Sequence, residues 1–317
     1  MEIVRIKKSQ VNKRVDIGLA ETLGLSRSKI QNLINDNRLF LKGKSKITKS
    51  YILKLGDKFE YYNCLQKPTR PVVDISVLYN DEQIIVVDKP TGVATHPAES
   101  WMGADVFTSL VINGFLPTCK DSPFTTQTKG EDTLEPSGIV SRLDAGTSGV
   151  LLISKTPESY SKMMESFKFH KDIEKHYIGA VEKHLKHSYG IIDAPIGRSS
   201  QKKFHFTINA DGKYAVTHYK VIKSWQNCQL LDIRIETGRT HQIRVHFSHL
   251  GHPVLGDITY GANSNLAEKY RLTRPFLHSS VLKIIHPITC EKMEFRAPLP
   301  KELNLSLGLI NQDNFKD

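Results

Sequence analysis

Cysteine is scarce in this sequence, and its four cysteines (Cys64, Cys119, Cys228 and Cys290) are widely separated. No two of them form a Cys-x-x-Cys pair, which argues against a disulfide framework and against a structural zinc site. Long apolar runs are also missing, since no stretch approaches the roughly 18 residues needed to span a bilayer. The N-terminus lacks the apolar segment of a secretory signal. These absences predict a cytoplasmic protein that does not insert into a membrane.

Acidic residues are outnumbered, because 33 Asp and Glu face 44 Lys and Arg, for a net charge of +11. The excess is concentrated in residues 1–63, which hold 14 basic and 6 acidic residues, whereas the remainder holds 30 and 27. A basic module joined to a nearly balanced one is typical of a polyanion-binding domain attached to a working domain. Charge therefore favours nucleic acid as the partner. A basic surface that only improves solubility is the alternative.

Residues 1–63 show the pattern of two helices followed by short strands. Apolar residues recur at helical spacing before Gly24, and Ser26 is a suitable N-cap for a second helix. Leu39 and Leu41 fit a short strand that ends in a turn at Gly43. Basic side chains are expected to be exposed between these elements: Arg27, Lys29, Arg38, Lys42, Lys44, Lys46 and Lys49.

The two prolines of residues 67–74 indicate a linker. Beyond it, short apolar runs and a turn signal at residues 89–92 predict a strand-rich region. The polar segment 116–137 predicts a long surface loop. We therefore divide the chain into a domain at residues 1–66, a linker at 67–74 and a second domain at 75–317.

The run from Gly138 to Leu152 places a polar segment between two apolar, strand-like stretches. Asp144 is its only acid, and it follows Arg142 and Leu143 directly. A carboxylate on a tight loop between strands more often serves chemistry than packing, although an isolated Asp in a turn is usually a turn or cap residue. Four further segments combine polar residues with a strand or a turn: 169–181, 212–219, 236–246, and 256–261 with 277–279 and 286–287.

In order and spacing, these five segments resemble the RluA-type pseudouridine synthases, whose usual central motif reads His-Arg-Leu-Asp-x-x-Thr-Ser-Gly. The resemblance covers residues 12–300. Residues 193–198 and 216–219 are typical of the branch that acts on large-subunit ribosomal RNA. Residues 1–66 resemble the S4 RNA-binding domain, with Asn37 where that family commonly has Gly. The resemblance implies an α+β fold, in which a small S4-like domain precedes a catalytic domain with a mixed, mainly antiparallel sheet.

The resemblance also assigns roles to single residues. Asp144 is the expected catalytic carboxylate, Arg244 its basic partner and Tyr177 the active-site aromatic residue, unless that tyrosine serves only packing. Arg142 falls at a side chain that enters the RNA. The sequence departs from the usual motif at two places: Ser141 replaces the usual His, and residues 145–146 replace a charged pair. Neither departure removes Asp144 or Arg142, so they affect substrate placement rather than catalysis.

Isomerisation of uridine to pseudouridine breaks the N-glycosidic bond, turns the base and joins C5 to C1′. It involves no redox change and no energy input, so no cofactor or metal is expected. The spacing of His241, His246, His249 and His252 lacks a His-Glu-x-x-His signature and agrees with this expectation. A carboxylate can serve as a nucleophile or as a base, and the sequence leaves both open.

The uridine must be flipped out of the RNA, and Tyr177 is suited to stacking on it. For Arg239, phosphate contact and plain solvation are both open. The complete set of expected RNA-binding residues is Arg142, Arg27, Lys29, Arg198, Lys202, Lys203 and Arg239. We expect a monomer that isomerises specific uridines in large-subunit ribosomal RNA. The same reaction on transfer RNA is the alternative. The alternative from another class is a non-catalytic RNA-binding or ribosome-assembly factor.

Overall fold

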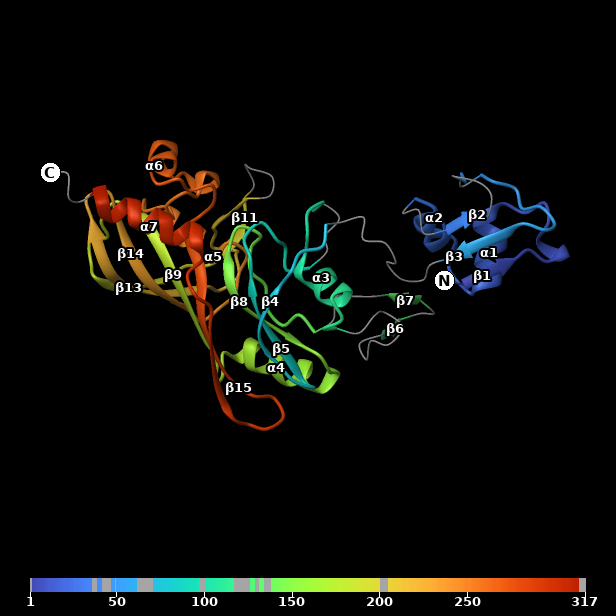
Figure 1. Ribbon diagram of the computed structural model, residues 1–317, viewed down its shortest axis with the longest axis horizontal. Helices are drawn as coiled ribbons and strands as arrows, with labels where there is room; N and C mark the ends of the chain where they lie inside the picture. The colour runs from blue at the N-terminus through green and yellow to red at the C-terminus, as the bar shows by residue number, and fades with distance from the viewer. Residues whose placement is uncertain are drawn as a thin grey trace. The chain divides into compact units, whose positions relative to one another are not determined.

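The computed structural model describes residues 2–35, 39–41, 47–48, 50–61, 71–96, 101–116, 126–128, 131–133, 138–199 and 205–313 (Figure 1). The chain divides into two compact units. The first consists of Met1–Thr69 with Pro117–Glu135, and the second of Arg70–Leu116 with Pro136–Asp317. Each unit has a hydrophobic core of its own.

In the first unit, two helices pack on a small antiparallel sheet. Helix α1 (Val15–Leu23) ends at Gly24, whose φ of 65° is left-handed, and helix α2 (Arg27–Asn35) begins after Ser26. The Ser26 hydroxyl accepts a hydrogen bond from the Lys29 amide at 3.2 Å, as expected of an N-cap. The strands are ordered β1-β3-β2, and their bounds are Glu2–Arg5 for β1, Leu39–Leu41 for β2 and Lys58–Tyr61 for β3. Both predicted helices and the predicted strand at Leu39 are confirmed.

The segment 116–137, predicted as a loop, contains a short hairpin. Strand β6 (Thr126–Thr128) pairs antiparallel with β7 (Glu131–Thr133). Three of these six residues are threonines, whose branched Cβ favours extended backbone. The remaining residues from 117 to 137 lie outside the described part of the chain.

The second unit is built on a nine-stranded sheet in the order β10-β13-β14-β9-β15-β8-β5-β4, with β16 also paired to β15. Every pairing is antiparallel except that of β15 with β8, which confirms the predicted mixed, mainly antiparallel sheet. A separate two-stranded sheet is formed by β11 and β12. The strand bounds are Ser76–Asn80 (β4), Ile84–Lys89 (β5), Ser148–Ser154 (β8), Glu174–Glu182 (β9), Tyr189–Asp193 (β10), Ile196–Arg198 (β11), Phe206–Ile208 (β12), Val216–Trp225 (β13), Cys228–Ile235 (β14), Leu277–Ile285 (β15) and Lys292–Arg296 (β16).

Helices cover both faces of this sheet. Alternate residues of its strands point to opposite sides, and apolar residues on both sides pack against helices. On β5 and β8, helix α3 packs against Ile85 and Leu151, whereas α4 packs against Ile84 and Leu152. On β9 and β14, α5 and α7 divide the two faces in the same way. The helix bounds are Val106–Ile112 (α3), Pro157–Phe169 (α4), Gln242–His249 (α5), Ser264–Lys269 (α6) and Lys301–Asp313 (α7), with a short 3₁₀ turn at Ile258–Tyr260.

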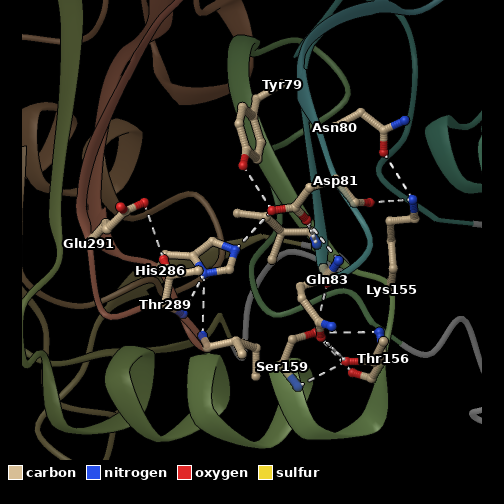
Figure 2. A network of polar contacts seen from close by, with 12 residues as sticks. Tyr79, Asn80, Asp81, Gln83, Lys155, Thr156, Ser159, His286, Thr289 and Glu291 are labelled. Carbon is tan, nitrogen blue, oxygen red and sulfur yellow. Dashed lines mark hydrogen bonds and ion pairs between the residues drawn. The ribbon is translucent and has the colours of Figure 1, made fainter.

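A network of polar contacts anchors the start of α4 to the turn between β4 and β5 (Figure 2). Thr156 caps the helix by accepting from the Ser159 amide, and its hydroxyl donates to the Gln83 side chain at 2.7 Å. Asp81 accepts from the Gln83 amide at 2.7 Å and contacts His286 Nε2 at 3.0 Å, which ties the turn to the end of β15. The network therefore joins the start of α4 to the turn between β4 and β5 and to the end of β15.

Gly149 lies where β8 pairs with β15, opposite Ser279. Its φ is +113°, and a Cβ atom there would lie 2.1 Å from the carbonyl oxygen of Ser279. We expect Gly149→Ala to lower the free energy of unfolding by about 2 kcal/mol or more, because the added carbon meets backbone that cannot rotate away. Gly114→Ala is the matched control, since Gly114 also has a positive φ (79°) but open space around it. Its expected loss is about 1 kcal/mol. Chemical denaturation checks this difference, and equal losses for the two variants would contradict it.

Candidate active site

A cavity of about 530 Å³ opens between α4, α5 and the central strands of the second unit. Its walls come from several separate parts of the sequence. They are residues 139–144 with Thr147 and Val150, the second half of α4 with His170, Lys175 and Tyr177 of β9, Ile235 with residues 238–244, Leu277, Ser279 and Leu282 of β15, and His96.

Asp144 lies in this cavity on a loop whose backbone is held from both sides. The Thr95 hydroxyl donates to the Leu143 carbonyl at 2.9 Å, and the Gly92 amide donates to the Ala145 carbonyl at 2.8 Å. From the β15 side, the Arg274 guanidinium donates to the Gly146 carbonyl at 3.2 Å. None of these contacts involves the carboxylate of Asp144, so the loop is held through its backbone and not through this side chain.

Arg244, on α5, joins two carboxylates. Its Nε and one terminal nitrogen form a forked pair with Asp257 at 2.6 and 2.8 Å, and its other terminal nitrogen contacts Asp144 Oδ2 at 3.3 Å. Asp257 is buried and Asp144 is partly exposed. Burial lowers the pKa of Arg244, but Asp257 and then Asp144 outweigh it, so that its pKa lies above the usual value. The structure therefore pairs Arg244 with Asp144 as predicted, but the tighter contact is with Asp257.

His241 lies beside Asp144, and Tyr260 contacts His241. His241 has the left-handed φ of 56°, which directs its Nε2 to within 3.8 Å of Asp144 Oδ2, while its Nδ1 lies 2.7 Å from the Tyr260 hydroxyl. Burial holds the pKa of His241 below its usual value despite the opposing charge of Asp144, so the ring is neutral at neutral pH. Tyr260 also stacks on the Arg244 guanidinium at 4.8 Å.

Tyr177 points into the same cavity from β9. It is only 7% exposed, packs among the apolar residues under α5 and hydrogen-bonds to the Ser279 side chain. Burial raises the pKa of its hydroxyl above the usual range, so the phenol stays protonated. Tyr177 thus offers the cavity an aromatic surface rather than an ionisable group.

Lys89 lies beneath the Asp144 loop and is completely buried. Its ammonium donates to the carbonyls of Pro90 at 2.9 Å and Val93 at 2.7 Å, and reaches the Ala145 carbonyl at 3.4 Å. Burial lowers the pKa of Lys89 to about 7, although the charge of Asp144 opposes this shift. The lysine connects the turn after β5 to the loop that carries Asp144.

The structure brings together five of the predicted site residues: Asp144, Arg244, Tyr177, Arg142 and Arg239 all line the cavity. Arg142 donates to the Thr240 hydroxyl at 3.1 Å.

The remaining predicted RNA-binding residues lie elsewhere. Arg198 ends β11 and does not line the cavity, while Lys202 and Lys203 lie outside the described residues. On α2, Arg27 is exposed, whereas Lys29, expected to be exposed, is half-buried; Arg27 contacts the buried Asp16 at 3.4 Å.

Sequence reasoning gave no role to several residues of this site. Asp257, Tyr260, Lys89, Lys175 and His170 were each part of a motif or turn, but nothing in the sequence indicated what they contact. The one available signal was at Lys89, a charged residue that ends an apolar strand immediately before a proline.

Among the described residues, no group of three or more His, Cys, Asp or Glu side chains is arranged to hold a metal ion. None of the helices in the described part of the chain combines the length and apolar composition that a membrane span requires.

Comparison with known proteins identifies the class of enzyme. The family model for RNA pseudouridylate synthase matches residues 83–249, which include Asp144, Tyr177 and Arg244. An uncharacterized RNA pseudouridine synthase of Mycobacterium bovis is 37% identical over 301 residues, covering 94% of each chain. A ribosomal large subunit pseudouridine synthase D of Pasteurella multocida is 33% identical, covering 94% of this chain and 91% of that protein. The chain belongs to the RNA pseudouridylate synthase family, as its motifs predicted, and is an isomerase that acts on RNA.

Solved structures agree at the level of the fold. Human RNA pseudouridylate synthase domain containing 4 superposes with a TM-score of 0.56 at 22% identity, covering 74% of this chain and 93% of that one. Human RNA pseudouridylate synthase domain containing 1 gives a TM-score of 0.53 at 25% identity and covers 71% of this chain.

Proposed function

We propose that Asp144 is the catalytic carboxylate of uridine isomerisation and that large-subunit ribosomal RNA is the substrate. One observation carries the assignment of Asp144. It is the only carboxylate among the described residues that line the cavity, and it shares that cavity with Arg244 and Tyr177. A cavity of about 530 Å³ is large enough for a flipped nucleotide.

The reaction needs a negatively charged group beside the sugar or the base while the glycosidic bond breaks. Asp144 supplies it, either as a nucleophile or as a base at the sugar 2′ position. The base then turns, C5 joins C1′, the C5 proton leaves and N1 takes up a proton, so atoms and charge balance. Tyr177 forms an aromatic wall for the uracil, and Arg142 is placed at the cavity to fill the gap that the flipped base leaves in the RNA.

The relatives support the ribosomal target. Those that are 30–33% identical over nearly their whole length include several ribosomal large subunit pseudouridine synthases D. The test is a map of pseudouridines in ribosomal and transfer RNA from cells with and without this protein. Loss of specific sites in large-subunit ribosomal RNA is expected. Loss confined to transfer RNA would replace the proposed substrate, and an unchanged map in both RNAs would overturn the proposed function.

Residues 1–66 are proposed to act as an S4-like RNA-binding domain, followed by a linker at 67–74 and a catalytic domain at 75–317. The two helices on a small sheet and the basic composition of the N-terminal residues support the S4-like assignment. The enzyme is proposed to work as a monomer in the cytoplasm.

Deletion of residues 1–63 is expected to weaken RNA binding and to flatten its dependence on salt, because this segment carries most of the excess positive charge. The remaining unit has its own core and should fold. Binding measured against salt concentration checks the prediction. An unchanged affinity and salt slope would contradict this division of labour.

A further inference from the structure

One end of the cavity is lined by four basic side chains. Lys168 and His170 stand at the end of α4, Lys175 on β9 and Arg239 on the loop before α5. Within the described part of the chain, none of these four side chains forms an ion pair. The nearby carboxylate of Glu236 is engaged by His218 at 2.6 Å.

Two of these cations are held in place by backbone carbonyls instead. Lys175 Nζ donates to the carbonyls of Glu236 at 3.1 Å and Thr237 at 3.3 Å. Arg239 Nε donates to the Tyr214 carbonyl at 2.9 Å. An ammonium has three donors and a guanidinium five, so both groups are oriented and still have N–H groups to offer. His170 is held to the same loop through the backbone of Glu236.

We propose that Lys175, Arg239 and His170 form a subsite for one phosphodiester of the RNA strand, beside the nucleotide whose base enters the cavity. The proposal rests on the proposed function, since it takes the RNA to be bound with a uridine at Asp144. A phosphodiester carries one negative charge on two unbridged oxygens, which suits an ammonium and a guanidinium side by side. The subsite would hold the backbone in register while Asp144 acts on the sugar or base.

The electrostatics of these side chains agree with this assignment. Burial and the neighbouring Arg239 lower the pKa of Lys175 to about 8. Burial, Lys175 and Arg239 likewise hold the pKa of His170 below its usual value, although Glu236 opposes them. A bound phosphate would remove this mutual repulsion and raise the pKa of Lys175. Binding then requires the protonated lysine, so affinity should fall as pH rises through about 8.

The experiment measures binding of a short single-stranded RNA with one uridine to the inactive Asp144→Asn protein. The phosphates next to the uridine are replaced one at a time by uncharged methylphosphonates. Neutralising one particular phosphate, or introducing Lys175→Met, should each weaken binding about tenfold. The two changes together should cost no more than either alone. Additive losses at every phosphate, or no binding of the RNA at low salt, would overturn the subsite.

A second arm uses pH and keeps the positive charge. Lys175→Arg stays charged, so its affinity should remain nearly constant from pH 7 to 9, whereas that of the parent protein falls. Burial also lowers the pKa of Lys89 to about 7, but Lys89 is common to both proteins. Lys162→Met is the matched control, because Lys162 lies on α4 outside the cavity lining and should leave binding and its pH dependence unchanged.

The two proposals fail separately. An arginine variant with the same pH dependence as its parent would exclude Lys175 as the titrating group and overturn the subsite. If Lys175 is coupled to one phosphate but the wild-type protein forms no pseudouridine, the subsite is supported and the proposed reaction is refuted.

Discussion

The Asp144→Asn protein is expected to form no pseudouridine and to bind RNA within a few-fold of the wild-type affinity. The amide is nearly isosteric with the carboxylate but cannot act as a nucleophile or a base. The fold should survive, because Lys89, Gly92, Thr95 and Arg274 hold the loop through backbone carbonyls rather than through this side chain. Single-turnover assays that detect pseudouridine directly, run beside a binding titration, check both halves of the prediction.

Turnover by Asp144→Asn above a few per cent of wild type would remove Asp144 from the catalytic role. A wild-type protein that binds RNA but forms no pseudouridine in any RNA tested would instead support a non-catalytic RNA-binding factor. The two results are distinguishable, because the first needs an active wild-type enzyme and the second needs an inactive one.

Replacement of Arg244 by Met is expected to abolish most activity and to destabilise the protein by about 3–5 kcal/mol, since it leaves the buried Asp257 without its partner. Arg244→Lys should be partly active. An ammonium keeps the charge but cannot form the fork with Asp257 while also reaching Asp144. Denaturation curves and single-turnover rates of both variants check these expectations.

A double variant separates the structural role of Arg244 from its chemical one. Arg244→Met with Asp257→Met removes both members of the buried pair, so much of the lost stability should return while activity does not. Recovery of activity together with stability would mean that Arg244 serves only the fold. Wild-type activity in the single Met variant would exclude Arg244 as the partner of Asp144, and Arg239 would be the next residue to test.

The prediction of local structure succeeded where short-range chemistry decides it. The left-handed residue at Gly24 and the cap at Ser26 depend only on neighbouring residues, and both lie where the sequence indicated. The hairpin within 116–137 was not predicted, because two strands of three residues each leave too short a pattern to recognise. The mixed sheet followed from the family resemblance rather than from periodicity.

The sequence by itself determined the chemical types of the site: one carboxylate at Asp144 within a polar loop, an aromatic residue at Tyr177, a basic residue at Arg244 and an excess of basic residues toward the N-terminus. These properties belong to single residues or to short segments, so no knowledge of distant contacts is needed to recognise them.

Only the tertiary structure decided which of these groups meet. Arg244 is shared between Asp144, which precedes it by 100 positions, and Asp257, which follows it by 13. Lys175 is oriented by carbonyls more than 60 positions away. Such contacts depend on how β8, β9 and β15 lie side by side and on where α4 and α5 cross them. The reason is physical: a hydrogen bond or ion pair depends on distances of a few ångströms, and packing of the whole sheet sets these distances between segments that are remote in sequence.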